Sequence, residues 1–299
     1  MKNYILLFLF FTIYVHAQIN RFFYEYKFIP DSNNKTDVKN EMMYLDINKN
    51  GSNYYSRDKY VSDSTNLAEM NKQIRSFSGS INVNRKEKQG MVSFKVTKTY
   101  PDFTTYLFRN ISSDRYKIKE DQKPEWKILP EKQKIGEYNA QKATTSFGGR
   151  EWVAWFSTDI PFQDGPYKFY GLPGLIVKIE DTTGSHIMTL VGNKTLPESA
   201  EEKELELPQN IRVFGMGGKE LEVTEDQFRK AWKAYVNDPT KNMREMMMGN
   251  TDNNKITFKV KTQDGKEISD PNQVFREMEK RTKESLAKNN NPIEPDLVK

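Results

Sequence analysis

The residues whose types could do chemistry lie in one segment, Arg150 to Gly171, which reads "REWVAWFSTDIPFQDGPYKFYG". It holds two aspartates, Asp159 and Asp164, on either side of a proline and near a glycine. Two carboxylates can share acid–base catalysis, with Arg150 or Glu180 in support. An aspartate in a Pro/Gly loop more often caps a turn, however. A carboxylate-dependent hydrolase acting through Asp159 and Asp164 is therefore the alternative hypothesis.

The same segment is rich in aromatic residues. If Arg150 begins a strand, side-chain alternation places Trp152 and Phe156 on one face and Trp155 on the other. Large rings on both faces favour a core contact on one side and a ligand on the other. We expect a surface for a hydrophobic or sugar-like ligand, with these candidate contacts: Arg150, Trp152, Trp155, Asp164, Tyr167, Phe169 and Tyr170.

Other catalytic chemistries have few residues available. The chain has no cysteine and two histidines, His16 and His186, which excludes disulfides, thiolate sites and multi-histidine metal centres within the mature chain. "DINKNGSNYYSR", from Asp46, resembles a calcium loop but has Arg57 where the bidentate glutamate belongs. The methionines near Met246 are more typical of core packing than of a copper site. We expect neither metal nor cofactor.

The hexamer "GLPGLI" follows this segment directly and is expected to be structural. It is not a phosphate loop, because no Lys-Ser/Thr follows and the next residues have the pattern of a strand. Pro173 suits the second position of a type II turn, and Gly174 supplies the positive φ of the third. The motif comprises Gly171, Leu172, Pro173, Gly174, Leu175 and Ile176.

The N-terminus predicts export. Lys2, the apolar run Tyr4–Val15 and the "VHAQ" cleavage pattern indicate a signal peptide over residues 1–17. Its removal lowers the formal charge of +5 by the one unit of Lys2. Both charge signs are mixed along the chain, so no nucleic-acid partner is expected. No later apolar run approaches the length of a membrane span, so no transmembrane segment of the mature chain is expected. The periplasm is the expected location, with secretion as the alternative.

The hydrophobic pattern predicts an α+β protein. Alternation and turn residues predict short antiparallel strands: Arg21–Ile29, Met42–Asn48, Met91–Thr99, Phe103–Arg109, Arg115–Lys119, Tyr138–Phe147, Arg150–Ser157, Leu175–Glu180 and Ser185–Val191. We expect one early helix, Asn66–Phe77, within a large sheet that is possibly curved like a half-barrel. A capping box at Thr224 and Gln227 predicts a helix to Val236, and Asp270 caps another. A short methionine helix, a strand Lys255–Thr262 and a loose tail after Asn289 complete the expectation.

These elements suggest an order of domains. Residues 18–195 form an antiparallel β-rich domain that contains the hexamer. Residues 196–210 are an acidic linker or loop, and residues 211–299 are a mainly helical part packed on the same domain.

The residues Gly149–Asp181 resemble the signature of the GLPGLI family, also called the Porph_ging family, which is named for the hexamer. The Gly-Arg before an aromatic strand, the Ile-Pro, the Gly-Pro and the hexamer occur in the family's order, and Lys134–Thr144 also fits. A cysteine frequent in relatives is absent near Asn139. The resemblance implies an exported protein of Gram-negative bacteria and implies no activity.

Together these features favour a non-catalytic periplasmic protein that uses an aromatic-lined surface. Its partner would be a hydrophobic or sugar-like ligand, or an outer-membrane or other envelope protein.

Overall fold

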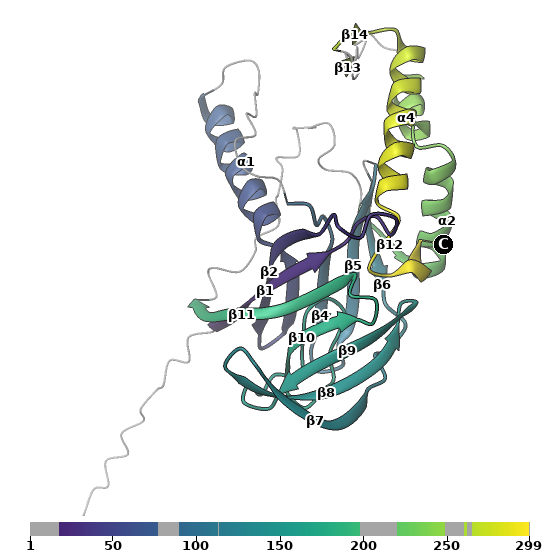
Figure 1. Cartoon of the computed structure of the whole chain (residues 1–299). Coiled ribbons are helices and arrows are strands. Elements are labelled where there is room, and N and C mark those ends of the chain that lie inside the picture. Colours follow the sequence, from purple (N-terminus) through teal and green to yellow (C-terminus); the bar gives the residue numbers. More distant parts are fainter. Residues whose placement is uncertain are drawn as a thin grey trace, which may run out of the picture.

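The computed structural model of the chain describes residues 18–76, 90–112, 114–197, 220–248, 260–261 and 265–298. The expected signal peptide lies outside these residues, as does the part of the acidic segment from residue 198 onward. Between them, the described residues form one large sheet with helices beside it (Figure 1).

Twelve strands form this sheet. In chain order they are β1 (Gln18–Phe28), β2 (Lys39–Asn48), β3 (Gly51–Ser56), β4 (Lys95–Thr99), β5 (Thr104–Ile111), β6 (Asp114–Lys119), β7 (Lys127–Ile135), β8 (Tyr138–Phe147), β9 (Arg150–Ser157), β10 (Leu175–Asp181), β11 (His186–Pro197) and β12 (Glu220–Thr224). Their order in space is β12-β6-β5-β4-β3-β2-β1-β11-β10-β9-β8-β7. All neighbours are antiparallel except β12, which is parallel to β6. The expected large antiparallel sheet is confirmed, and it is open, with β12 and β7 at its edges.

Four helices are described. They are α1 (Arg57–Ser76), α2 (Glu225–Asn237), α3 (Lys241–Met248) and α4 (Pro271–Lys288), followed by the single 3-10 turn η2 (Pro295–Leu297). Figure 1 shows α1 apart from the other helices, while α2 and α4 run side by side. No helix in this described part of the chain is both apolar enough and long enough to cross a membrane.

The sheet bends around the loop between β9 and β10. The Phe169 ring packs edge-on against Trp152 of β9, and the Phe169 carbonyl accepts a hydrogen bond from Lys98 of β4 at 3.3 Å. β4 and β9 are six positions apart in the sheet, which in a flat sheet would separate them by roughly 29 Å. Both reach the same residue because the sheet curls, and the loop fills its inner side.

The aromatic strand pattern places the core correctly. On β1, Phe22, Tyr24 and Tyr26 are buried on the inner face. Phe22 packs against Phe162 of the loop, and the Tyr24 hydroxyl donates to the Ile176 carbonyl at 2.7 Å. β8 and β9 have the predicted bounds. The loop therefore belongs to the hydrophobic core and does not lie over it.

Several local predictions hold. The helix cap at Thr224 forms as a capping box, with Gln227 N donating to Thr224 Oγ1 at 3.3 Å and Thr224 N donating to Gln227 Oε1 at 2.9 Å. Asp270 caps α4 by accepting from Gln273 N at 2.9 Å. The segment that resembles a calcium loop is a hairpin, because β2 and β3 pair directly across Asn50-Gly51.

Other predictions are wrong, or only partly covered by the described residues. The early helix begins at Arg57 and not at Asn66, because Ser56 Oγ accepts from Lys59 N at 3.0 Å and starts it there. The strands β3, β7 and β12 were not expected. The first two residues of the expected linker, Leu196 and Pro197, continue β11. Of the expected strand at Lys255–Thr262, only β13 (Val260–Lys261) is described, paired with β14 (Glu267–Ile268).

The segment after Asn289 is not loose. Ile293 and Leu297 are buried among the core residues, and Glu294 is buried as well. Its Asn-Pro and Glu-Pro pairs are typical of an irregular chain. Tertiary contacts order the segment despite this local sequence.

Candidate functional site

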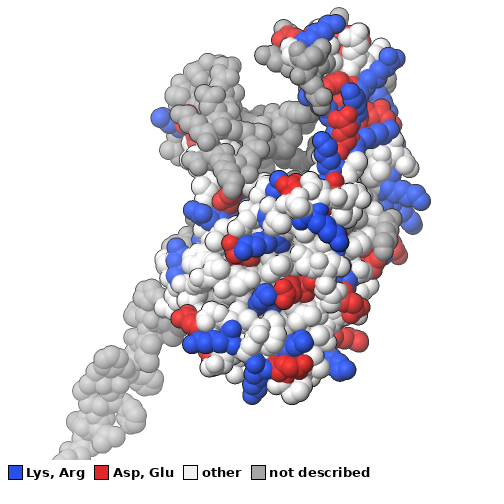
Figure 2. Space-filling view, in the orientation of Figure 1, with Lys and Arg blue, Asp and Glu red and all other residues white. Residues whose placement is uncertain are grey.

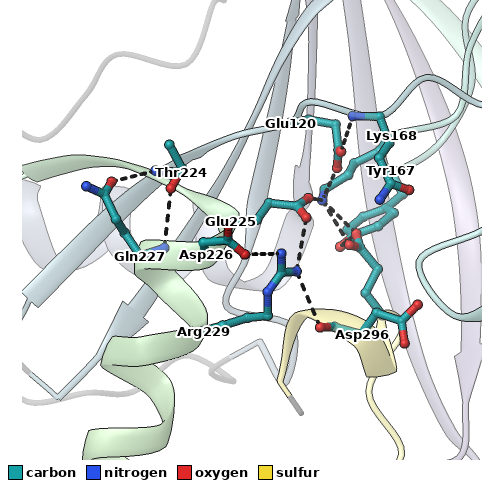
Figure 3. A network of polar contacts seen from close by, with 11 residues as sticks. Glu120, Tyr167, Lys168, Thr224, Glu225, Asp226, Gln227, Arg229 and Asp296 are labelled. Carbon is teal, nitrogen blue, oxygen red and sulfur yellow. Dashed lines mark hydrogen bonds and ion pairs between the residues drawn. The ribbon is translucent and has the colours of Figure 1, made fainter.

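The most unusual site in the described residues is a buried lysine surrounded by glutamates. The Lys168 side chain is 0% exposed. Its Nζ lies 2.5 Å from Glu120 Oε2, 2.8 Å from Glu294 Oε1 and 3.8 Å from Glu225 Oε1. Oxygens of the three carboxylates lie within 4.8 Å of one another. Figure 3 shows Lys168 pointing into this group. We call these four residues the Lys168 cluster.

Four separate segments supply the cluster. Lys168 comes from the loop between β9 and β10, and Glu120 follows the last residue of β6. Glu225 is the first residue of α2, where the positive end of the helix dipole favours a carboxylate. Glu294 comes from the C-terminal segment. The cluster therefore joins the loop to the sheet, to a helix and to the C-terminus.

Tyr167, the residue before Lys168, has a strained backbone and contacts the same cluster. Tyr167 has a φ of +56°, a conformation that costs an aromatic residue roughly 1–2 kcal/mol. Its hydroxyl donates to Glu294 Oε1 at 2.5 Å. Burial, followed by the nearby charge of Glu294, raises the pKa of Tyr167. Tyr167 thus remains a hydrogen-bond donor to the same carboxylate that pairs with Lys168.

The charges in the cluster are unequal. Burial disfavours the ammonium of Lys168, but the charges of Glu294 and Glu120 outweigh it and raise the pKa of Lys168. Burial and then the charge of Glu120 raise the pKa of Glu225 to about 7. Three carboxyls around one lysine leave an excess of acid, and the raised pKa of Glu225 reflects it. Arg229, which contacts Glu225 Oε2 at 3.2 Å, offsets part of the excess.

The cluster has the ligand type of a hard cation site, since carboxylate oxygens are what Mg²⁺ and Ca²⁺ prefer. The ammonium of Lys168 already lies among these oxygens, however, at the distances given above. The chain's own cation therefore takes the position that a metal ion would need. The arrangement is that of an internal ion cluster.

A second buried pair fixes the same loop from the other side. Lys98 of β4 is 0% exposed and pairs with Asp164, which is 1% exposed. Lys98 Nζ also donates to the Gly165 carbonyl at 2.7 Å, and the Tyr100 hydroxyl donates to Asp164 Oδ2 at 2.5 Å. Burial lowers the pKa of Lys98, and the charge of Asp164 opposes this only in part.

Arg150 lies in a third polar group. Its Nη1 contacts Asp181 Oδ2 at 3.0 Å, and Asp181 Oδ1 accepts from His186 N at 2.7 Å. The His186 Nδ1 faces the Tyr26 hydroxyl at 2.7 Å. Burial, and then the charge of Arg150, lowers the pKa of His186 to about 4. His186 is therefore a neutral core residue at neutral pH.

The expected aromatic surface is not on the outside of the molecule. The rings expected to line it are all buried, with exposed fractions of 1% for Trp152, 9% for Trp155, 1% for Tyr167, 0% for Phe169 and 9% for Tyr170. They pack on core neighbours, as Tyr170 does in stacking on Phe103 at 4.6 Å. Large rings that alternate along a strand are compatible with a buried core as well as with a ligand site, and the sequence alone does not distinguish the two. Whether they bind a ligand stays a prediction.

The two candidate catalytic aspartates do not form a pair. Asp159 is exposed, whereas Asp164 is buried and held by Lys98 and Tyr100. A hydrolase needs both carboxylates at one solvent-accessible place. This geometry gives the hydrolase hypothesis no support.

The hexamer forms a turn, but not of type II. Gly174 N donates to the Leu172 carbonyl at 2.8 Å, which closes a three-residue turn centred on Pro173. Gly174 has a φ of +155°, far from the +80° of a type II turn. A Cβ at Gly174 would overlap the Ser157 carbonyl. The glycine is required mainly because two backbones approach closely, and the structural role expected for the hexamer follows from that.

Little in the sequence predicts the Lys168 cluster. Glu120, Glu225 and Glu294 are far apart along the chain, and Glu225 alone of the three lies in a recognised pattern, the capping box of α2. One available signal was Lys168 itself, a charged residue between Tyr167 and Phe169. A lysine in so apolar a run is rarely buried without a carboxylate partner.

The fold and these contacts define a class: an open antiparallel sheet curled around a loop that carries the hexamer. The model of a family described as "Protein of unknown function (Porph_ging)" matches residues 148–178. This match confirms the resemblance over the strand β9, the loop and the start of β10.

Other comparisons add little. No curated protein matches the chain. Two structures of a protein called PNGF-II, in space groups P21 and C2, are similar with a TM-score of 0.44 and identities of 15% and 16%. The alignments cover 72% of this chain but only 33% and 32% of those chains, so this chain spans about a third of their length. So distant a likeness defines neither activity nor ligand.

Proposed function

We propose that the chain is an exported, non-catalytic binding or accessory protein of the bacterial cell envelope. In this proposal residues 148–178 hold the fold together and take no part in a reaction. The supporting observation is that the buried charged groups of the loop, Asp164 and Lys168, and Arg150 beside it are each engaged with other parts of the chain. A catalytic group would need to reach a substrate.

The partner in this proposal is a hydrophobic or sugar-like ligand or an outer-membrane or other envelope protein, bound away from the buried rings. Figure 2 shows Lys and Arg interspersed with Asp and Glu over the face in view. Such a mixed surface is suited to a protein or neutral ligand and differs from the basic face typical of nucleic-acid binding. The periplasm, or alternatively the exterior, would be its location.

The test is recovery of the tagged full chain from fractionated bacteria, followed by crosslinking and mass spectrometry of what co-purifies. The proposal predicts a processed chain that starts near Gln18 in the periplasmic or envelope fraction, with a reproducible partner or ligand. A control with Asp159→Asn should recover the same partner, because that exposed carboxylate has no role here. An uncleaved chain in the cytoplasm would contradict export. Turnover of a substrate that Asp159→Asn or Asp164→Asn abolishes would contradict the non-catalytic role.

A further inference from the structure

The C-terminal segment, residues 290–297, follows an irregular course across the turn between β8 and β9. It leaves the end of α4, where Asn291 N donates to the Pro30 carbonyl at 3.0 Å and Asn291 Nδ2 to the Ile29 carbonyl at 2.8 Å. At its far end Asp296 N lies 3.5 Å from the Gly148 carbonyl. Between Asn291 and Asp296, the segment is held by side chains from other parts of the chain.

Arg150 holds the first half of the segment. Its Nη2 donates to Asn291 Oδ1 at 2.6 Å and to the Pro292 carbonyl at 2.7 Å, and its Nε lies 3.2 Å from the same carbonyl. Proline cannot donate a backbone hydrogen bond, so its carbonyl is the backbone group available for recognition. Because two nitrogens of the Arg150 guanidinium contact the Pro292 carbonyl, they fix both the position and the direction of the segment at this residue.

Lys168 and Tyr167 hold the middle. Glu294 receives the Tyr167 hydroxyl on Oε1 and the Lys168 ammonium at 3.0 Å on Oε2. The Glu294 side chain is 5% exposed. A buried carboxylate in this position is stabilised only while both donors are present.

Two glycines make room for the segment. Gly148 and Gly149 have φ values of +62° and +84°. A Cβ at Gly148 would lie 2.5 Å from Glu294 Cγ, and one at Gly149 would lie 2.7 Å from the Asp296 carboxylate. The turn between β8 and β9 thus allows close approach as well as a tight reversal.

We propose that Gly148, Gly149, Arg150, Tyr167 and Lys168 form a peptide-binding site whose ligand is the chain's own C-terminal segment. The recognised chemistry is an Asn-Pro-hydrophobe-Glu-Pro sequence, with Ile293 and Leu297 entering the core and Glu294 entering the Lys168 cluster. All five receptor residues lie within the stretch that the family model matches. The inference holds whichever partner or ligand the protein has.

The test uses the full chain with a recognition sequence for a site-specific protease inserted between Lys288 and Asn289, both exposed. The folded protein is cleaved, and size exclusion with mass spectrometry shows whether the segment stays bound. A fluorescent synthetic peptide of residues 289–299 is then exchanged for it. We expect retention after cleavage and binding of the labelled peptide, while a peptide of scrambled order fails to bind.

Variants locate the contacts. A peptide with Glu294→Gln should bind at least about tenfold more weakly, as expected when a buried charged hydrogen bond is lost. In the body of the protein, Arg150→Met should weaken binding, and Glu151→Gln, an exposed neighbour on the same strand, should not. Because the peptide variants leave the folded body unchanged, they decide the matter even if Arg150→Met fails to fold. Immediate loss of the cleaved segment, or equal binding of the wild-type and Glu294→Gln peptides, would overturn the proposal.

Discussion

Two buried lysines hold the loop between β9 and β10 in opposite ways. Lys98 reaches the loop from β4 and meets one carboxylate, Asp164. Lys168 reaches out from the loop and meets three, from β6, α2 and the C-terminal segment. Both side chains are fully buried. The first pair is balanced in charge, and the second group carries an excess of acid.

The pKa directions reflect this difference. Burial lowers the pKa of Lys98, whereas the glutamates overcome burial and raise the pKa of Lys168. The excess acid appears as the raised pKa of Glu225. The Lys98 pair therefore attaches the loop to its own sheet, and the Lys168 cluster attaches distant segments to the loop in a way that depends on pH.

The largest expected effect separates the two lysines. Lys168→Met leaves three neighbouring carboxyls without their cation and should cost toward the upper end of about 3–5 kcal/mol near neutral pH. Lys98→Met leaves only Asp164, which keeps the Tyr100 hydroxyl, and should cost toward the lower end. Urea unfolding of both variants measures the difference. Equal losses would remove the distinction drawn between the two sites.

The next effect concerns the hexamer. Gly174→Ala should destabilise by about 1–3 kcal/mol because the new Cβ meets the Ser157 backbone. Gly171→Ala is the matched control: Gly171 has a φ of +94° with nothing within 4 Å of an added Cβ. Gly171→Ala should lower the free energy of unfolding by only about 1 kcal/mol, because an alanine is disfavoured at this backbone conformation. Thermal unfolding of the two variants would contradict the close approach if Gly171→Ala proved the more damaging.

A smaller effect is the pH dependence of Glu225. Its pKa in the folded chain, about 7, lies above the ordinary value of 4.5. Between these values the folded chain keeps a proton that the unfolded chain has lost, so this group's stabilisation declines as pH rises through this range. The glutamine of Glu225→Gln does not ionise, so the stability of this variant relative to wild type should improve from about pH 5 to about pH 8.

Asp226→Asn serves as the control for that profile. Asp226 also contacts Arg229, but its side chain is 79% exposed. Urea unfolding at these two pH values should show that the free energy of unfolding of Asp226→Asn, relative to wild type, hardly changes between them. If Glu225→Gln follows wild type across the range, Glu225 does not carry the excess proton.

The smallest expected effect is at Asp159. Because this side chain is exposed on the loop, Asp159→Asn should change the free energy of unfolding by no more than about 0.5 kcal/mol. Calorimetric scans of Asp159→Asn and Asp164→Asn check this. Asp164→Asn disturbs the Lys98 pair and should clearly lower the melting temperature. Matching losses would indicate that the two aspartates are coupled after all.

The parts of the fold that local patterns determine were predictable. β8 alternates from Ala143 to Phe147 and β9 from Glu151 to Ala154, and α2 and α4 begin at capping residues that act within one turn. β7 escaped prediction because Pro130 interrupts a mostly exposed, charged edge strand. β12 does alternate, with Leu221 and Val223 less exposed than their neighbours, but only over five residues, and its parallel partner β6 is distant in sequence.

The segment Arg150–Gly171, predicted from the sequence as the candidate site, supplies Lys168 to the cluster. The rings expected to line a ligand site are buried, and the buried charges of the segment contact other parts of the chain. Aromatic residues in an irregular loop are compatible with ligand binding or with burial, and only tertiary structure decides between them. The docking of Glu294 depends on residues from three other segments, which no local pattern contains.

The central claim is that Lys168 and Glu294 join the loop to the C-terminal segment. A double-mutant cycle with Lys168→Met, Glu294→Gln and the combined variant measures this link directly by urea unfolding. The account predicts a coupling free energy of about 1–3 kcal/mol, whereas Lys168→Met with Glu151→Gln should be additive within about 0.5 kcal/mol. Additive losses for the Lys168 and Glu294 variants would contradict it.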